Sequence, residues 1–191
     1  MPRRVVILAG PSGSGKSRLA RRLGVPTLRL DDFYRDLDEP GMPMSDLGLV
    51  DWDHPGSWDA DQAVSTIAEL CATGTADVPV YSLSASRRVD LEHLRVSTDL
   101  FVAEGLFAPQ IVDTCRRAGL LEEAICLRRP RMVTFCLRLF RDLREGRKAP
   151  HVLVRRGWRL MKDEPAVVAE AVAHGCVPMT PKQAEKRLQR S

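Results

Sequence analysis

The stretch GPSGSGKS, from Gly10 to Ser17, decides the fold of this chain. It matches the pattern G-x-x-x-x-G-K-[ST]. An apolar run, Val5 to Ala9, precedes it, and a helix-forming run, Ser17 to Leu23, follows it. A strand, a glycine-rich loop and a helix in this order predict a loop that binds nucleotide phosphates, whereas a Gly/Ser-rich connector that fits the pattern by chance would lack both flanks.

Each residue type in this loop has a physical reason. Glycine reaches backbone dihedrals that are closed to other residues, so successive N–H groups turn inward around phosphate oxygens at a helix N-terminus. Lys16 supplies a positive charge for the β- and γ-phosphates during transfer, and the Ser17 hydroxyl is placed to ligate Mg²⁺. The residues predicted to bind the nucleotide are Gly10, Ser12, Gly13, Ser14, Gly15, Lys16, Ser17 and Arg18.

Length and composition predict one P-loop domain over residues 1–191, located in the cytoplasm. A chain of 191 residues buries a sizeable core, and a net charge of +4 suits an acidic ligand such as ATP without requiring nucleic acid. The five cysteines are widely spaced and form no C-x-x-C pair, which favours reduced thiols over a zinc site or disulfides. No apolar run approaches membrane-spanning length, so no membrane partner is expected. The oligomeric state stays open, with a homo-oligomer among the options.

A second short strand, Val25 to Leu30, leads directly into Asp31-Asp32-Phe33-Tyr34-Arg35. Ligands of open α/β sheets bind beyond the carboxyl ends of the strands, so these side chains are expected to face the phosphates. Asp31 is predicted to be the general base that takes the proton of an attacking hydroxyl, with Asp32 reaching the water shell of the metal or capping a turn. The alternative is that both carboxylates cap a short helix.

Residues 39–98 are predicted to cover the acceptor substrate. They begin with a long ordered loop, Glu39 to Trp58, that contains Asp51-Trp52-Asp53-His54-Pro55. Ser57 is the expected N-cap of a helix over residues 58–72. Val78 to Leu83 alternates like a strand, which Pro79 confines to a sheet edge or a substrate-facing hairpin. Residues 84–98 have no assigned structure beyond a connector.

A buried strand, Asp99 to Gly105, ends in an acid and a glycine. Glu104 takes the place of a Walker B acid and is predicted to hold Mg²⁺ through water; the alternative is a carboxylate satisfied by neighbouring backbone. A helix at residues 109–119 and a fourth strand at residues 124–127 follow. These elements predict a three-layer α/β P-loop NTPase fold with a mostly parallel central sheet.

The chain becomes basic from Arg128 onward. Two helices flank a break at residues 146–150, and they predict a helical lid over about residues 138–152. Arg138, Arg141 and Arg147 are predicted to close over the transferring phosphoryl group, with Arg141 in a catalytic role. The arginines of the second helix are interpreted as a solvated face. A last edge strand at residues 176–179 and a helix capped by Thr180 complete the chain.

With these landmarks placed, the chain resembles the uridine kinase family of P-loop phosphotransferases, which is related to phosphoribulokinase. The matching motifs are GPSGSGKS at 10–17, DDFYR at 31–35, DWDHP at 51–55, VPVYSLSASR at 78–87, FVAEG at 101–105 and RLFRDLREGR at 138–147. The resemblance implies that Asp31 is the general base and that Glu104 lies near Mg²⁺. It also implies acceptor contacts for Tyr34, Asp53, Tyr81 and Arg87, and lid positions for Arg138, Arg141 and Arg147.

Two departures from the family pattern concern the acceptor and the lid. Ala85 stands where uridine kinases usually carry a histidine that reads the pyrimidine, and Glu145 stands near an expected lid arginine. Without a side chain that hydrogen-bonds the base, a site distinguishes less well between that base and other acceptors. The predicted activity is transfer of the γ-phosphoryl group of ATP, with GTP open, to a hydroxyl of a small molecule in the presence of Mg²⁺. A nucleoside is the first acceptor and another polyol, sugar or vitamin the alternative.

A third hypothesis is a nucleotide-binding regulator or nucleic-acid partner, based on the arginine-rich residues 128–162. Single-stranded nucleic acid binding relies on aromatic side chains on which bases stack. This segment has Phe135, Phe140 and Trp158, and two of them fit the apolar face of the predicted helix. No nucleic acid partner is therefore expected.

Overall fold

A computed structural model describes residues 3–46, 48–144 and 150–189. The α-helices and strands are β1 (Arg4–Ala9), α1 (Lys16–Leu23), β2 (Thr27–Arg29), α2 (Ala60–Thr73), β3 (Thr75–Ser82), β4 (Arg87–Arg95), β5 (Leu100–Glu104), α3 (Val112–Arg117), β6 (Leu121–Leu127), α4 (Arg131–Arg144), α5 (Pro150–Ala173), β7 (Val177–Met179) and α6 (Pro181–Leu188). Short 3-10 helices are η1 (Leu30–Phe33), η2 (Pro55–Ser57) and η3 (Ala108–Ile111).

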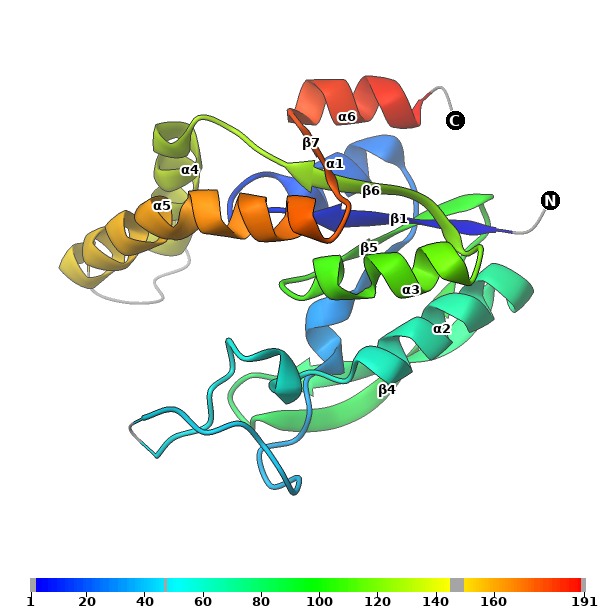
Figure 1. The fold of residues 1–191 in the computed structure, drawn as a ribbon, viewed down its shortest axis with the longest axis horizontal. Helices are drawn as coiled ribbons and strands as arrows, with labels where there is room; N and C mark the ends of the chain where they lie inside the picture. The colour runs from blue at the N-terminus through cyan, green and yellow to red at the C-terminus, as the bar shows by residue number, and fades with distance from the viewer. Residues whose placement is uncertain (1–2, 47, 145–149, 190–191) are drawn as a thin grey trace.

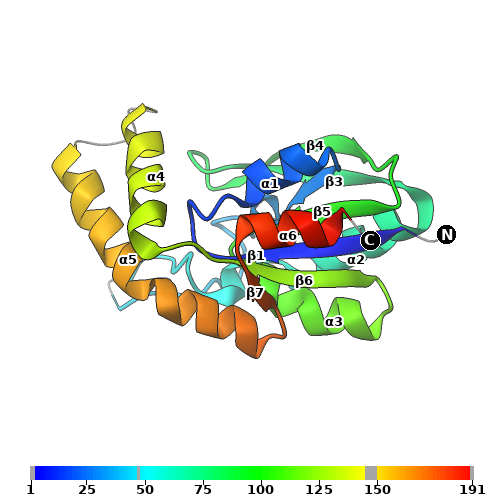
Figure 2. The same ribbon diagram turned by 90° about the horizontal axis from the view of Figure 1, so that it is seen from above.

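The central sheet is parallel, with the strand order β2-β5-β1-β6-β7. Strand β1 lies in the middle, and Val5 to Ala9 are buried because helices cover both faces of the sheet. Val5, Ile7 and Ala9 share a core with residues of α2, α3 and α5, whereas Val6 and Leu8 pack with residues of α1 and α6. Figures 1 and 2 show these three layers. The parallel sheet and the layers predicted from the sequence are confirmed.

Strands β3 and β4 form a separate antiparallel hairpin. The hairpin predicted at Pro79 is therefore present, and residues 84–98, which had no assigned structure, supply its second strand. Strand β4 is exposed over most of its length, and its alternation, Val89-Asp90-Leu91-Glu92, is short and places both apolar side chains in solvent. The prediction of Ser57 as the N-cap of the next helix was wrong. Ser57 is buried in η2, and the Asp59 carboxylate accepts from the backbone N–H of Gln62 at 2.9 Å.

Helices α4 and α5 pack on each other and project from one end of the sheet (Figures 1 and 2). Gly157 allows this close packing, because a Cβ there would lie 2.8 Å from the Phe135 ring. Helix α5 runs without a break through Pro165 to Ala173. Its C-terminal half reaches the sheet, where Ala171 joins the core. Within the described residues, no helix is both long and apolar enough to cross a membrane.

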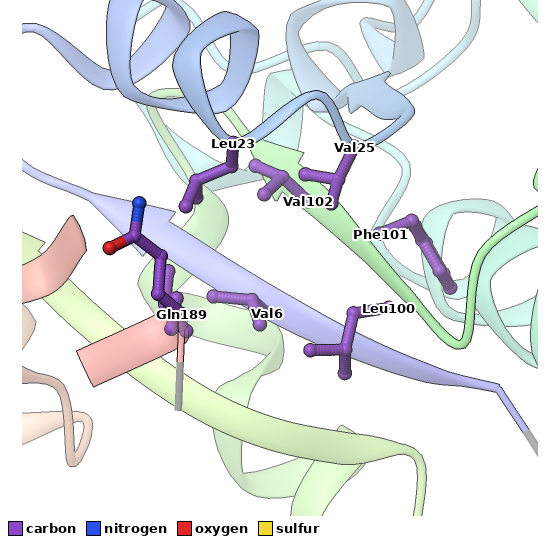
Figure 3. A pocket seen from close by; sticks show the side chains of 8 residues that line it. Val6, Leu23, Val25, Leu100, Phe101, Val102 and Gln189 are labelled. Atoms are coloured by element: carbon purple, nitrogen blue, oxygen red, sulfur yellow. The ribbon is translucent and has the colours of Figure 1, made fainter. Parts of the chain in front are cut away.

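A small apolar cavity of about 120 Å³ lies between the C-terminal ends of α1 and α6, over β1 and β5 (Figure 3). Its walls include Val6, Leu23, Val25 and Val102. Leu23 ends α1, whereas the glycine-rich loop precedes the start of the same helix. The lining is apolar apart from Gln189 and includes no charged side chain, so it does not suit phosphates, and the loop itself is the better candidate for the nucleotide site.

Candidate active site

The glycine-rich loop has the backbone that an anion cradle requires. Gly10, Gly13 and Gly15 have φ angles of 128°, 84° and 102°. A Cβ on Gly10 would lie 2.4 Å from the Leu127 carbonyl oxygen, so only glycine fits at the start of the loop. Helix α1 begins at Lys16 with no side-chain cap on its first N–H groups and no acid in its first turn. Its N-terminus is therefore available to phosphate oxygens.

Side chains stabilise this loop from both sides. The Lys16 ammonium donates to the Gly10 carbonyl at 2.8 Å and so lies across the loop. On the other side, Arg129 Nε donates to the Ser14 carbonyl at 2.8 Å. The Ser14 side chain is 0% exposed, and within the described residues its Oγ has no hydrogen-bond partner. The sequence analysis assigned no role to Arg129, although a basic residue after the carboxyl end of a predicted strand is a usable signal.

Ser17 and Glu104 face each other at the ends of neighbouring elements. The Ser17 hydroxyl donates to Glu104 Oε1 at 2.5 Å, and Glu104 ends β5 beside Leu8 of β1. Two oxygen ligands of this kind fit Mg²⁺, which takes one or two protein oxygens and completes its shell with phosphate oxygens and water. Within the described residues, no group of three or more His, Cys, Asp or Glu side chains could hold a metal ion alone. Ser17 and Glu104 are the two side chains here that could contribute oxygen ligands to a metal bound with a nucleotide.

Asp31 lies in η1, directly after β2, and its side chain is exposed. Its Oδ1 accepts from the backbone N–H of Leu106 at 2.8 Å. The pairing of Arg29 with Glu104 in the β2–β5 ladder brings Asp31 and Glu104 to the same edge of the sheet. Gly105, between Glu104 and Leu106, is tightly enclosed, because a Cβ there would lie 2.9 Å from Asp31 Oδ1. One turn after β5 therefore positions both carboxylates.

Asp32 has a different environment from Asp31. Burial raises its pKa above the ordinary value, while the nearby Arg29 guanidinium and a backbone N–H of Tyr81 act in the opposite direction. Its Oδ2 lies 3.4 Å from Arg29 Nε. This carboxyl contributes to the packing between η1 and the β3–β4 hairpin.

Aromatic rings gather next to Asp31. The Tyr34 ring lies 5.8 Å from Trp52, 5.7 Å from Tyr81 and 5.9 Å from Phe107, measured between ring centroids. These four residues come from η1's C-terminal end, the long loop, β3 and the segment after β5. The sequence analysis gave acceptor roles to Tyr34 and Tyr81 but none to Trp52 or Phe107, because their meeting depends on the tertiary fold.

The Tyr34 hydroxyl has acidic neighbours. Burial, with added repulsion from the carboxylates of Asp31 and Asp53, raises the pKa of Tyr34 well above the ordinary value for tyrosine. The phenol therefore stays protonated at physiological pH and can donate a hydrogen bond. Burial also raises the pKa of Tyr81, whose hydroxyl donates to the Arg35 carbonyl at 3.3 Å.

Two neighbouring arginines of the hairpin have different surroundings. Arg87 is exposed, and its Nη2 lies 3.4 Å from Asp38 Oδ2. Arg88 is half-buried: its Nε donates to the Tyr34 carbonyl at 3.1 Å and its Nη2 to Asp59 Oδ2 at 3.3 Å. The backbone N–H of Arg88 also donates to Asp36 Oδ1 at 2.7 Å. Arg88 thus ties the hairpin to η1 and to the first turn of α2, a role that the sequence analysis missed.

The loop residues singled out by sequence lie at the rim of this region. Asp53 is exposed, and its backbone N–H donates to Asp51 Oδ1 at 3.1 Å. His54 Nδ1 accepts from the Gly56 N–H at 3.0 Å and so stabilises the turn into η2. Ala85 is exposed in the hairpin turn next to Ser86, which has a φ of 50°. The hairpin end thus offers a methyl group at the position where a reader of bases was expected.

The lid residues are only partly described. Arg138 and Arg141 lie on the backbone of α4, and no contacts of their side chains are described. Arg147 and Glu145 lie outside the described residues. The lid prediction therefore rests on the helical hairpin of α4 and α5 next to the glycine-rich loop.

A glycine-rich loop that leads from a parallel strand into a helix, with a carboxylate at the end of the neighbouring strand, defines the class of P-loop phosphotransferases. The chain belongs to the Phosphoribulokinase / Uridine kinase family, whose model matches residues 5–169. Membership in this family confirms the resemblance that the motifs indicated. It also agrees with the α/β P-loop fold that the structure has. It gives the coarse activity as well: a P-loop kinase that uses a nucleoside triphosphate to phosphorylate a small molecule.

Individual relatives are distant. A uridine kinase of Shewanella pealeana is 29% identical over 161 residues, which cover 78% of this chain and 74% of the relative. A uridine kinase of Streptococcus mutans is 21% identical over 165 residues, covering 83% and 77%. A solved structure from Silicibacter sp. TM1040, described as a candidate fructose transport system kinase, superimposes with a TM-score of 0.62 at 20% identity and covers 88% of this chain and 85% of its own. These similarities support the family and the fold, while the acceptors in the names belong to the relatives.

Proposed function

We propose that the protein transfers the γ-phosphoryl group of ATP, in the presence of Mg²⁺, to a hydroxyl group of a nucleoside. The observation that carries this proposal is the common edge on which the Asp31 carboxylate, the Ser17–Glu104 pair and the loop N-terminus of α1 lie. A base, metal ligands and a phosphate cradle at one edge are the parts that phosphoryl transfer to an alcohol requires.

Each group of residues has a separate role in the transfer. The N–H groups of the loop and the Lys16 ammonium hold the phosphates, and Ser17 and Glu104 hold the metal, which neutralises developing charge when bound. The Leu106 N–H fixes Asp31 through Oδ1. Asp31 Oδ2 then takes the proton of the acceptor hydroxyl as it attacks.

The acceptor is held on the aromatic side of Asp31. The rings of Tyr34, Trp52, Tyr81 and Phe107 provide flat apolar surface, and the protonated Tyr34 hydroxyl and the Asp53 carboxylate provide a donor and an acceptor for sugar hydroxyl groups. The exposed Arg87 contacts the acceptor at the solvent-facing edge of this site. Arg138, Arg141 and Arg147 are proposed to approach the phosphates from the lid, with Arg141 stabilising charge on the transferring group.

A second acceptor class has a specific observation in its favour. The exposed Ala85 supplies no hydrogen bond to a base, so a polyol, sugar or vitamin alcohol would lose nothing at this position. We rank it below a nucleoside because the aromatic surface suits a planar base as well as a sugar face.

Product identification tests both classes. The protein is incubated with ATP, Mg²⁺ and a pool of nucleosides, sugars and vitamin alcohols, and products are identified by mass spectrometry. We expect a monophosphate of one nucleoside. Phosphorylation confined to a sugar or polyol would replace the first acceptor by the second, and ADP without any phosphorylated alcohol would contradict the kinase proposal.

A further inference from the structure

Arg129 joins the loop to the helical hairpin. It lies between β6 and α4, and Figures 1 and 2 show this link passing next to the loop that enters α1. The half-buried side chain donates from Nε to the Ser14 carbonyl at 2.8 Å. Its Nη2 lies 3.4 Å from the position that a Cβ would take on Gly15. The guanidinium therefore covers the outer side of the Ser14–Gly15 peptide.

This contact fixes the direction of an N–H group. In a trans peptide, the carbonyl and the N–H of the same unit point in opposite directions. With the Ser14 carbonyl directed toward Arg129, the N–H of Gly15 is directed to the opposite side of the loop. Gly15 has a φ of 102° and no Cβ, so without such a contact its peptide could rotate at little cost. Arg129 thus selects one orientation of the Ser14–Gly15 peptide.

The same residue lies at the start of the hairpin formed by α4 and α5. Helix α4 begins two residues after Arg129, and the Pro130 carbonyl accepts from the N–H groups of Val133 at 2.8 Å and Thr134 at 3.2 Å. Thr134 is 0% exposed, whereas Met132 and Val133 of the same turn are exposed, so the first turn of α4 is held on one side. Pro130 alone separates Arg129 from the first residue of α4, so the chain couples the position of α4 to that of the guanidinium.

We propose that Arg129 is a positioning residue for the nucleotide: it orients the Ser14–Gly15 peptide and connects the start of α4 to the phosphate loop. The proposal rests on the proposed function, because it requires that the loop bind a nucleoside triphosphate. Arg129 acts through the loop backbone and needs no direct contact with the reacting atoms.

Arg128 provides a matched control. It has the same charge and precedes Arg129 in the chain, but its side chain is exposed and its backbone N–H donates to the Met179 carbonyl on the far side of β6. The variants are Arg129→Gln, Arg129→Lys and Arg128→Gln. Dissociation constants of ATP with Mg²⁺ and of inorganic tripolyphosphate are measured by calorimetry, together with KM, kcat and the unfolding midpoint.

We expect Arg129→Gln to weaken both ATP and tripolyphosphate by about tenfold, the effect of losing one hydrogen bond from a charged donor. Arg129→Lys keeps one donor and should recover part of the loss, and Arg128→Gln should change either constant by less than about twofold. KM for ATP should rise with the dissociation constant, and the unfolding midpoint should not account for the change. If Arg129→Gln folds poorly, the lysine variant provides the comparison.

Two results would overturn the inference while the proposed function stands. Equal weakening by Arg128→Gln and Arg129→Gln would show that only the overall charge matters. A lower unfolding midpoint in Arg129→Gln with unchanged ATP and tripolyphosphate constants would show that the contact is merely structural. Failure of the unaltered protein to bind ATP would instead remove the proposed function, and the inference with it.

Discussion

The donor end and the acceptor end of this molecule are built in different ways. The donor end is one continuous stretch, Gly10 to Ser17, and its binding groups are mostly backbone N–H groups oriented by glycines. The acceptor end combines side chains from four separate segments, one of which belongs to a hairpin outside the main sheet. Backbone geometry tolerates few residue types, whereas side-chain surfaces tolerate many. The donor end is therefore strongly constrained, and the acceptor end can change its substrate.

The largest effect is expected from Gly10→Ala at the donor end. The new Cβ would meet the Leu127 carbonyl at 2.4 Å in a backbone with a φ of 128°, so the loop must shift away from β6. ATP affinity should fall at least about 100-fold, or about 2.7 kcal/mol, by calorimetry. Gly24→Ala is the control, because Gly24 also has a positive φ of 67° but no atom within 4 Å of the added Cβ. Gly24→Ala should lower the free energy of unfolding by about 1 kcal/mol and leave ATP binding intact. If both variants lost the same ATP affinity, the glycine-rich loop would not be the reason for the effect of Gly10→Ala.

Gly105→Ala tests the junction between the two ends. The backbone of Gly105 is outside the left-handed region, so the effect is steric: the added Cβ would lie 2.9 Å from Asp31 Oδ1 and 2.7 Å from Leu30 Cβ. Displacing the base should lower kcat roughly 10- to 100-fold in steady-state assays, while the dissociation constant of ATP changes by less than about threefold. A variant that loses ATP affinity with unchanged kcat would place Gly105 on the donor side instead.

Arg88→Ala tests the acceptor end. Removing its guanidinium frees the Tyr34 carbonyl and the Asp59 carboxylate and loosens the hairpin. KM for the acceptor should rise about tenfold, with KM for ATP little changed. Arg87→Ala should raise the acceptor KM less, because its side chain is exposed and lies against Asp38. The opposite ranking of the two arginines would mean that Arg87 makes the more important contact with the acceptor.

The smallest effect concerns Asp32 and pH. Because burial raises the pKa of this carboxyl in the folded protein above its ordinary value of 3.8, its ionised form costs stability. That cost is absent below the unfolded-state pKa and develops as pH rises through the folded-state pKa. Asp32→Asn should therefore match the unaltered protein near about pH 3 and be more stable at about pH 7, by less than about 1 kcal/mol, in denaturant titrations. Lower stability of the variant at neutral pH would show that the pairing with Arg29 outweighs burial.

The donor end was also easier to predict from the sequence than the acceptor end. Strand β1 contains the whole apolar run Val5 to Ala9, and the glycine-rich loop, the strand that ends at Glu104 and the helix cap at Thr180 lie where their patterns placed them. These features depend on short-range rules. The N-cap was assigned to Ser57 because a serine before a helical pattern satisfies the same rule as Asp59, and only the backbone decides between them.

The acceptor side was less predictable for a physical reason. Phe107 and Arg88 lie outside the quoted motifs, and Trp52 lies within DWDHP without an assigned role; the contacts of all three join segments that are far apart in the chain. Strand β4 was missed because its alternation, Val89-Asp90-Leu91-Glu92, is short and is flanked by charged residues on a strand that is mostly exposed. Arg129 belongs to the donor end but contacts the loop across 115 positions of sequence, so it escaped the same local rules.

The central claim is that Asp31 serves the chemistry and not the binding of the nucleotide. Turnover and ATP affinity of Asp31→Asn, measured with the acceptor found by product identification, test it most directly. The account predicts that kcat falls roughly 10²- to 10⁴-fold, the usual contribution of a general base, while the dissociation constant of ATP with Mg²⁺ stays within about twofold. An Asp31→Asn variant that turns over as fast as the unaltered protein would contradict the account.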